Sequence, residues 1–364
     1  MSLAFLSYLW MFILIPLVFL CSLGMLIQLS KKPSLVTKQP KLTFIVAVWN
    51  EGRRVAKCVN SILTQNYPVE NIRIIVVGGG NQETVEECKK LAGEHKIEYM
   101  MEKERRGKWF ALNTALKKVK TDYVAFTDAD CVLEKDWLKK MLTHDADIVV
   151  ADYLSISEKT LKGKFYAYVL YIGPRLSEGL NKFLRNGEFI GIGSLVKSKV
   201  FEKIKFRNSF IEDWWFVEDA KKRNFSVEHS TAKTYEHAPE TLNGLRKGLL
   251  RLSKGFVLEA MSMGNASSIF MSAFYIIAAL SIPFNIYQII SGSQFAINSI
   301  LLTIFSLAVF SLVCSIKYKN YRFIFYSPMM IPLMAFTGLF SLEAVVKMLF
   351  GREIKWEIYN KTGK

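Results

Sequence analysis

Short apolar runs alternate with amphipathic stretches between residues 42 and 151. Runs rich in β-branched and aromatic residues predict buried strands, and the stretches between them carry apolar positions at helical spacing. The expected strands are Leu42–Val48, Ile72–Val77, Ile97–Met101, the run within Tyr123–Cys131 that ends in two carboxylates, and Asp147–Ala151. The expected helices lie at 55–65, 83–91, 108–119 and 134–142. This alternation predicts parallel βαβ units with right-handed crossovers, and a ligand crevice at the carboxyl ends of the strands.

Longer apolar runs lie outside this alternation. Leu3–Leu29 carries no charge, can cross a bilayer, and lacks the flanks of a signal peptide, so it predicts a retained anchor. Three further candidate spans are Ala266–Ile290, Phe295–Ile316 and Phe323–Val346. The third run contains Pro328, Pro332 and Glu343, which a lipid-facing helix accommodates poorly. If this run does not cross the bilayer, two spans remain, so we expect two to three spans between residues 266 and 350.

These runs divide the chain into five parts. We expect an anchor at 1–30, a soluble domain at 40–235, an interfacial amphipathic helix within 236–262, a membrane region at 266–350 and a basic tail at 351–364. The apolar runs predict a multi-pass protein of the plasma membrane, and the lysines that follow the anchor predict that its soluble domain is cytoplasmic. The tail is also basic, whereas four full spans would place it outside, unless one of the last segments lies in the interface or re-enters.

Composition adds information about partners and redox state. The chain is 51% hydrophobic and has a formal net charge of +16. Because the sequence carries membrane anchors and lacks a nucleic-acid recognition module, this charge favours anionic lipid headgroups and not nucleic acid. The five cysteines have neither pairing nor metal-ligand spacing, as is typical of reduced cytosolic thiols. Nothing in the sequence indicates an oligomeric state.

Two acids end the central predicted strand. Side chains two residues apart in a strand point the same way, so Asp128 and Asp130 can both face the crevice. Two close carboxylates repel each other unless a cation lies between them, and Mg²⁺ or Mn²⁺ binds such a pair while bridging substrate phosphates. The alternative is a surface turn, in which Asp is common.

Two further stretches carry candidate chemistry. In Glu212-Asp213-Trp214-Trp215, an acid beside indole walls could act as a general base, with the indoles stacking on a sugar. The alternative is a helix start with Asp213 as the cap and both tryptophans in the core. The run Gly78–Gly80 lacks the pattern of a phosphate-binding loop and indicates a sharp turn with close backbone approach to a ligand.

The order of these features resembles family 2 of the inverting GT-A glycosyltransferases, in the membrane-bound branch that includes cellulose, chitin and hyaluronan synthases. The resemblance covers about Leu42 to Gly255. It is carried by Ala47 to Glu51, by Ser61-Ile62-Leu63-Thr64-Gln65-Asn66-Tyr67-Pro68, by Gly107 to Asn113, by Asp128-Ala129-Asp130 and by Glu212-Asp213 followed by Asn224-Phe225. It implies a GT-A fold with a mostly parallel, Rossmann-like sheet and flanking transmembrane helices.

The resemblance also implies roles for individual residues. Asp130 would hold Mg²⁺ or Mn²⁺, Asp128 the metal or the donor ribose, and Asp213, with Glu212 beside it, would deprotonate the acceptor hydroxyl. The implied donor site comprises Ala47, Trp49, Glu51, Gly79, Lys108, Asp128, Ala129 and Arg251. The expected acceptor site comprises Gly191, Gly193, Trp214 and Trp215. The expected partners are therefore a nucleotide-sugar, a lipid or glycan acceptor, and the membrane.

Two departures from the family pattern keep alternatives open. Gly78–Gly80 replaces the family's Asp-Asp-Gly, which leaves the choice of nucleotide undefined. On the interfacial helix only Arg251 of the processive enzymes' Gln-x-x-Arg-Trp remains, which favours transfer of a single sugar. A processive polysaccharide synthase is the first alternative, and a non-catalytic sugar-nucleotide-binding or scaffold protein is the second.

Overall fold

The computed structural model describes residues 3–29, 39–155, 191–237, 241–255 and 286–321, with separate residues between 163 and 183, at 276 and 324, and between 338 and 350. Its internal contacts divide it into two compact units. The sheet unit consists of Lys32–Ile156 and Arg185–His237. The helical unit consists of Met1–Lys31, Ser157–Leu184 and Ala238–Lys364.

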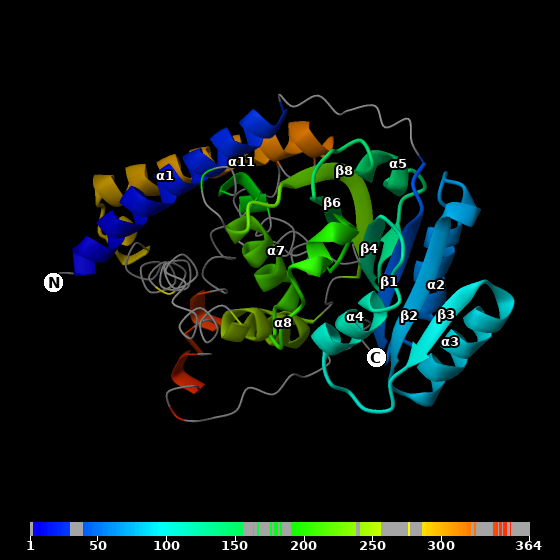
Figure 1. Ribbon diagram of the computed structural model, residues 1–364. Helices are drawn as coiled ribbons and strands as arrows, with labels where there is room; N and C mark the ends of the chain where they lie inside the picture. The colour runs from blue at the N-terminus through cyan, green and yellow to red at the C-terminus, as the bar shows by residue number, and fades with distance from the viewer. Residues whose placement is uncertain are drawn as a thin grey trace. The chain divides into compact units, whose positions relative to one another are not determined.

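A mixed eight-stranded sheet forms the centre of the sheet unit, within the described residues (Figure 1). Its order is β3-β2-β1-β4-β7-β6-β8-β5. The first four of these strands run parallel, β7 is antiparallel to both β4 and β6, β6 is parallel to β8, and β5 is antiparallel to β8. The strands are β1 Leu42–Trp49, β2 Ile72–Gly79, β3 Ile97–Met101, β4 Tyr123–Asp128, β5 Val132–Leu133, β6 Ile148–Ser155, β7 Ser194–Lys197 and β8 Val227–Glu236.

The helices of the sheet unit cover both faces of the sheet. They are α2 Arg54–Leu63, α3 Gln82–Glu94, α4 Lys108–Leu116, α5 Trp137–Met141 and α7 Glu212–Lys222, with short 3₁₀ helices at Val69–Asn71 and Ser198–Glu202. Alternate residues of β1 enter different cores, because successive side chains of a strand point to opposite faces. Phe44 packs with side chains of α2, α3 and α5, and Ile45 packs with those of α4 and α7. The result is a three-layer α/β arrangement.

The register brings the carboxyl ends of the parallel strands together. Ala47 of β1 lies opposite Asp128 of β4, and Trp49 lies opposite Gly79 of β2. The chain leaves β1, β2 and β4 at this edge, where the sequence places its candidate donor-binding and metal-binding residues. The carboxyl ends of these strands therefore meet at one edge of the sheet, as the alternation of strands and helices predicts.

The four parallel strands were predictable, whereas three strands in the other half of the sheet were not. β5 and β7 are too short to give a periodic pattern. β8 buries Ser230, Ala232 and Thr234 on its inward face, so its sequence lacks the alternation of large apolar residues that marks a half-buried strand. The expected strand at Asp147–Ala151 forms as β6 and continues to Ser155.

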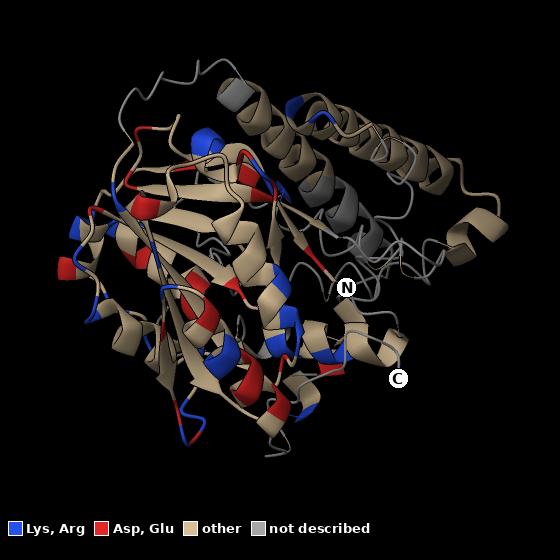
Figure 2. Ribbon diagram, turned by 90° about the vertical axis from the view of Figure 1, so that its right-hand side faces the viewer, with Lys and Arg blue, Asp and Glu red and all other residues tan. Residues whose placement is uncertain are grey.

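The helical unit contains α1 Leu3–Leu29, α8 Leu242–Lys254 and α11 Gln294–Tyr318. α1 and α11 pack side by side (Figures 1 and 2). α1 also approaches residue 179 closely, since a Cβ built on Gly24 would lie 2.0 Å from the carbonyl oxygen of Gly179. Only small residues permit such an approach between two backbones, as is common where helices pack in membranes.

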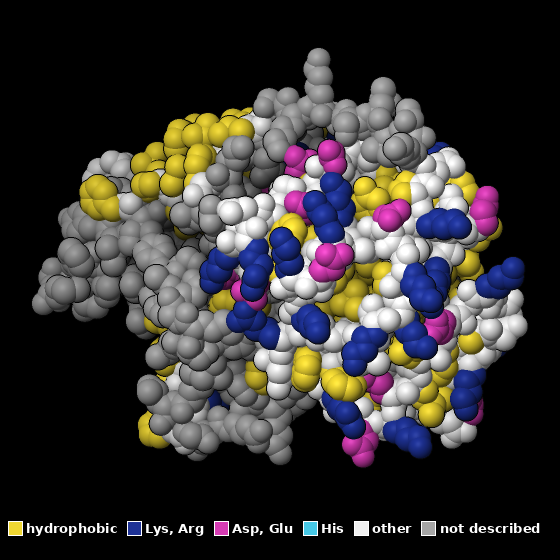
Figure 3. All heavy atoms as spheres, in the orientation of Figure 1, with side chains coloured by type: hydrophobic (Ala, Val, Ile, Leu, Met, Phe, Trp, Pro, Cys, Tyr) yellow, Lys and Arg dark blue, Asp and Glu magenta, His cyan; other side chains and the backbone are white. Residues whose placement is uncertain are grey.

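Among the residues that the structure describes, α11 is the one helix long and apolar enough to cross a membrane, and Ile15–Ile27 forms a shorter apolar stretch. Large apolar side chains on α1 and α11 are exposed, including Phe12, Phe19, Leu301 and Phe305. Figure 3 shows exposed hydrophobic side chains, in yellow, gathered at the upper left, where Figure 1 draws these helices. α11 covers the predicted span Phe295–Ile316. Most of Ala266–Ile290 and Phe323–Val346, and all of the tail 351–364, lie outside the described residues, so these assignments stay predictions.

Candidate active site

A lysine links three elements of the sheet unit. Lys108 is the first residue of α4, Asp128 the last of β4, and Glu212 the first of α7. The Lys108 Nζ atom lies 2.5 Å from Asp128 Oδ1 and 3.8 Å from Glu212 Oε1. Burial alone would lower the pKa of Lys108, but the nearby carboxylates, Asp128 first, outweigh burial and raise its pKa. Lys108 is therefore a fixed positive charge beside two acids.

Asp213 is held by two backbone amides. The amide of Gly191 donates to Asp213 Oδ2 at 3.0 Å, and the amide of Trp214 donates to Oδ1 at 3.0 Å. The N-cap residue of α7 is Ile211, which makes no side-chain capping bond. Asp213 therefore lies inside the first turn of the helix and does not cap it, and its carboxylate has a defined orientation.

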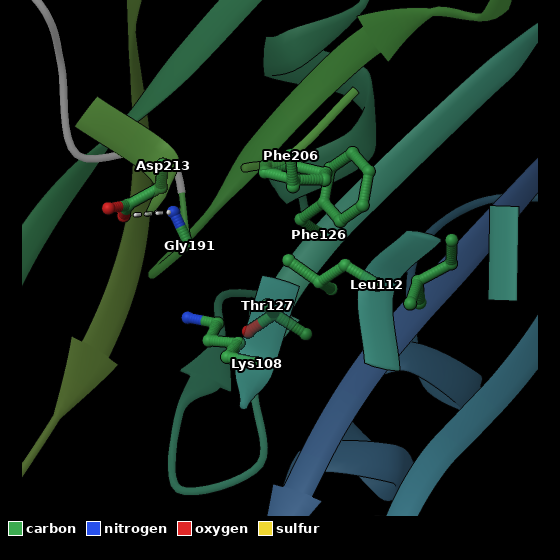
Figure 4. Close-up of a pocket in the computed structure, with 8 residues that line it drawn as sticks. Lys108, Leu112, Phe126, Thr127, Gly191, Phe206 and Asp213 are labelled. Carbon is green, nitrogen blue, oxygen red and sulfur yellow. Dashed lines mark hydrogen bonds between the residues drawn. The ribbon is translucent and has the colours of Figure 1, made fainter. Parts of the chain in front are cut away.

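Lys108 and Asp213 reach the same small pocket from different elements (Figure 4). The pocket lies next to the carboxyl end of β4, and Phe126 and Thr127 of that strand form part of its wall. Its lining is Ile45, Lys108, Leu112, Phe126, Thr127, Gly191, Phe206 and Asp213. A cationic group and a carboxylate thus face one space.

Two glycines leave room for these contacts. A Cβ atom built on Gly191 would lie 2.5 Å from Lys108 Nζ and 3.1 Å from Asp213 Oδ2. A Cβ atom built on Gly193 would lie 2.4 Å from the hydroxyl oxygen of Thr234. Thr127 anchors the segment between them, since its hydroxyl donates to the carbonyl oxygen of Ile192 at 3.3 Å. Both glycines belong to the expected acceptor site, and Gly191 lies directly beside Lys108 and Asp213.

Asp130, the expected metal ligand, is 7% exposed. Its charge and those of Asp128 and Glu51 act on the thiol of Cys58, whose pKa is raised first by burial and then by these acids. Within the described residues, no group of three His, Cys, Asp or Glu side chains could hold a metal by itself. Two hard carboxylates nevertheless fit Mg²⁺ or Mn²⁺, which usually take one or two protein carboxylates and complete their shell with phosphate and water.

The expected donor residues at the ends of β1 and β2 lie side by side. Trp49 is opposite Gly79 in the register, and the guanidinium of Arg105 lies 5.6 Å from the centre of the Trp49 ring. Glu51 pairs with Arg54 at 3.2 Å. Ala129, between the two expected metal ligands, is buried. The structure thus collects these side chains at one edge, and their contacts with a donor stay a prediction.

The expected residues at Trp214, Trp215 and Arg251 have different surroundings. The two indoles are 8% and 1% exposed, so both lie largely within the protein in this conformation. Arg251 lies on α8 of the helical unit. The roles of these three residues in substrate binding stay predictions.

Gln65 and Asn113, each from one of the family motifs, support the site although neither lines the pocket. Gln65 donates to the carbonyls of Ser61 and Glu134, at 2.9 and 2.7 Å, and accepts from the amide of Leu138 at 3.0 Å. These bonds join α2 to the segment that follows Asp130. Asn113 exchanges two hydrogen bonds with the backbone of Phe206, which lines the pocket. The sequence showed both motifs as patterns. It did not show what Gln65 and Asn113 bind, because most of their hydrogen-bond partners are distant in the chain.

The fold is that of a GT-A glycosyltransferase domain. Residues 43–205 match the model of the Glycosyl transferase family 2. The fold is similar to that of the mannosyltransferase PcManGT from Pyrobaculum calidifontis, whose structure was solved in complex with GDP-Man and Mn²⁺. The TM-score is 0.64 and the sequence identity is 18%, and the match covers 97% of this chain and 100% of that one. The expected GT-A fold is confirmed.

Curated relatives are also glycosyltransferases. The chain is 34% identical over 183 residues to Glycosyltransferase GlyA of Streptococcus pneumoniae serotype 4, covering 46% of this chain and 26% of that protein. It is 25% identical over 240 residues to the poly-beta-1,6-N-acetyl-D-glucosamine synthase of Staphylococcus aureus strain COL, covering 63% of this chain and 58% of that protein. The chain therefore spans less than two thirds of the length of these relatives.

Proposed function

We propose that this protein is a membrane-anchored, metal-dependent, inverting glycosyltransferase that moves a sugar from a nucleotide-sugar to a hydroxyl group of a lipid or glycan acceptor. One observation carries the proposal: Lys108, linked to Asp128, and Asp213 reach the same pocket. A cationic group suits the leaving diphosphate, and a carboxylate across the same space suits the acceptor proton. The family match of residues 43–205 supports this chemistry.

Asp213 is the general base in this proposal. The acceptor hydroxyl gives its proton to a carboxylate oxygen of Asp213 while the hydroxyl oxygen bonds to the anomeric carbon of the sugar. The bond from that carbon to the diphosphate breaks, and the nucleoside diphosphate leaves with the electron pair. Attack from the opposite face inverts the anomeric centre. The amides of Gly191 and Trp214 support this role because they orient both carboxylate oxygens.

Asp128 and Asp130 would hold the divalent cation, with Glu51 nearby. When bound, Mg²⁺ or Mn²⁺ would neutralise charge on the leaving diphosphate. Lys108 contributes a further positive charge, since its raised pKa keeps it protonated at every physiological pH. Binding of the donor itself is assigned to the strand ends, with Ala47, Trp49, Glu51, Gly79 and Ala129, and to Arg251.

The helical unit supports a membrane location. α11 is long and apolar enough to span a bilayer. α1 coincides with the apolar run Leu3–Leu29 that the sequence predicts to be an anchor. We therefore propose the parts 1–30 and 266–350 as membrane segments, with 40–235 as a cytoplasmic catalytic domain and 236–262 as an interfacial helix. A catalytic domain held at a bilayer suits a lipid-linked or growing glycan acceptor.

A processive polysaccharide synthase is the second candidate. The likeness to the poly-beta-1,6-N-acetyl-D-glucosamine synthase of Staphylococcus aureus, over 63% of this chain, favours it. Product length separates the two candidates, because a processive enzyme releases long chains whereas a single-sugar transferase adds one residue. Mass spectrometry of the product from a defined lipid or glycan acceptor measures this directly.

The test of the proposed function is an Asp213→Asn variant in detergent, assayed for transfer and for metal-dependent nucleotide binding. Loss of a general base reduces rates by about 10² to 10⁴-fold, while nucleotide binding should persist. Asp145→Asn is the matched control, because the Asp145 side chain is 86% exposed and pairs with Lys197 on the surface. If Asp213→Asn transfers sugar as fast as the parent, Asp213 is not the base. If the parent binds nucleotides but transfers nothing, the non-catalytic alternative holds.

A further inference from the structure

The contact of Lys108 with Asp128 brings an ammonium group to a carboxylate that is also an expected metal ligand. Lys108 Nζ lies 2.5 Å from Asp128 Oδ1, and each of the two side chains is 29% exposed, so a ligand from solvent can reach the contact. A divalent cation binds carboxylate oxygens at short range, about 2.0–2.1 Å for Mg²⁺. Two cations on one carboxylate are close neighbours and repel each other, so the Lys108 ammonium group and a metal ion compete for Asp128.

Lys108 lies where a positive charge needs an anionic partner. It is the first residue of α4, and Gly107 before it has a φ angle of 105°, which lets the chain turn into the helix. The N-terminus of a helix carries partial positive charge, so a lysine there is unfavourable unless acids lie around it. Besides Asp128, the carboxylate of Glu212 lies 3.8 Å from Nζ. Separating Lys108 from Asp128 therefore costs free energy, and another anion can offset that cost.

The diphosphate of a nucleotide-sugar is an anion of this kind. The lysine ammonium group binds phosphate oxygens as a point charge, and divalent cations bind them as well. Once a diphosphate is bound, it attracts both cations, and Lys108 no longer needs Asp128 as its partner. The cost of separating Lys108 from Asp128 thus arises with the first ligand to bind and not again with the second. Two ligands that share one such cost bind with positive cooperativity, and the coupling acts equally on both.

We propose that Lys108 couples binding of the divalent cation to binding of the donor diphosphate, by pairing with Asp128 when no diphosphate is bound and with the diphosphate when one is. Lys108 then weakens binding of Mn²⁺ or Mg²⁺ without a nucleotide, and it strengthens binding of the nucleotide once the ion is present. This inference rests on the proposed function, because it assumes that the crevice binds a nucleotide-sugar together with a divalent cation.

The experiment measures Mn²⁺ binding to the purified full chain in detergent, with and without a nucleoside diphosphate, from the electron paramagnetic resonance signal of free Mn²⁺. UDP, GDP, CDP and ADP are first compared by calorimetry, and the one that binds the parent most tightly is used. We expect the nucleotide to tighten Mn²⁺ binding by at least about tenfold, the worth of one contact between charged groups. Asp130→Ala lacks an expected metal ligand and gives the background from Mn²⁺ bound elsewhere.

Lys108→Gln should change two affinities in opposite directions. Without nucleotide, Mn²⁺ should bind about tenfold more tightly than in the parent, because no ammonium group competes for Asp128. With Mn²⁺ present, the nucleotide should bind about tenfold more weakly, because the diphosphate loses a cationic partner. A general structural defect weakens both affinities, so the opposite signs identify the coupling. Lys108→Arg keeps the charge and should keep the weak binding of Mn²⁺ without nucleotide.

Lys117→Gln is the matched control, because it removes an exposed lysine at the other end of α4. It should leave both affinities unchanged. Thermal unfolding provides a second readout: Mn²⁺ alone should raise the Tm of Lys108→Gln more than that of the parent, since a ligand that binds more tightly stabilises the folded state more. A lower Tm together with a loss of both affinities in Lys108→Gln would assign Lys108 a structural role and overturn the inference.

Measurements on the parent separate this inference from the proposed function, and they do not depend on the folding of a variant. If the parent binds nucleotide but holds Mn²⁺ equally tightly with and without it, only the coupling is wrong. The same conclusion follows if Lys108→Gln keeps the parent's ratio of the two Mn²⁺ affinities. If the parent binds no nucleoside diphosphate with or without Mn²⁺, the proposed function is wrong and the coupling falls with it.

Discussion

The amide of Gly191 donates a hydrogen bond to Asp213 Oδ2 at 3.0 Å, although 22 residues separate them in the chain. The same glycine leaves the space in which Lys108 Nζ lies, since a Cβ there would be 2.5 Å from that atom. Gly191 thus sets the distance between the candidate base and the cation linked to Asp128. Because the Gly191 backbone, the Asp213 carboxylate and the Lys108 ammonium group lie in contact, a small substitution at Gly191 tests their arrangement.

Gly191→Ala should lower transfer by about 10- to 100-fold without unfolding the protein. The added methyl group displaces either Lys108 or the segment that orients Asp213, and misplacement of a catalytic group by about 1 Å can cost about 10²-fold in rate. Gly93→Ala is the control, because a Cβ at Gly93 meets nothing within 4 Å. Steady-state kinetics and the Tm of both variants measure the effect. Equal rates for Gly191→Ala and the parent would show that this spacing is irrelevant to transfer.

Asp130→Ala should weaken nucleotide binding by at least about tenfold and remove its dependence on Mn²⁺ or Mg²⁺. The reason is that a hard divalent cation held by two protein carboxylates and a diphosphate loses one of its few charged ligands. Calorimetric titrations with and without Mn²⁺, with Asp145→Asn as the surface control, measure the change. Nucleotide binding that keeps its full metal dependence in Asp130→Ala would exclude this residue as a ligand.

The parallel half of the sheet was predictable chiefly because β1, β2 and β4 are largely buried and form nearly continuous apolar runs. Phe44 and Ile45 enter different cores, yet both are apolar. The site was predictable only as separate motifs. The hydrogen bond from Gly191 to Asp213 and the contact of Lys108 with Asp128 could not be predicted from the local sequence. Each joins residues about 20 positions apart that only the fold brings together.

Gln65→Ala should lower the free energy of unfolding by about 2–3 kcal/mol, because it leaves a buried carbonyl and the amide of Leu138 without their partner. Since these bonds fix the segment after Asp130, metal affinity should fall as well. Gln82→Ala is the control, because the Gln82 side chain donates a hydrogen bond to Glu86 at 2.6 Å on the exposed surface of α3. Chemical denaturation measures both variants. A loss no greater than that of Gln82→Ala would contradict a role in holding α2 to α5.

Glu178→Ala should destabilise the helical unit more than any single substitution of its exposed acids. Glu178 is fully buried, bonds Arg175 at 2.6 Å and the Tyr318 hydroxyl at 2.7 and 2.6 Å, and pairs with Lys317 at the end of α11. Its removal leaves two buried cations without this carboxylate, and breaking a buried pair in this way costs about 3–5 kcal/mol.

Glu343→Ala is the matched control, because Glu343 also joins two cations, Arg246 and Lys347, but its side chain is 26% exposed and water can replace it. Thermal unfolding in detergent should therefore give a markedly larger drop in Tm for Glu178→Ala. Glu178→Gln should lie between the two, since an amide keeps the shape and one acceptor oxygen but not the charge. If all three variants melt together with the parent, the buried cluster does not hold α11 in the helical unit, and packing of the apolar helix faces alone must do so.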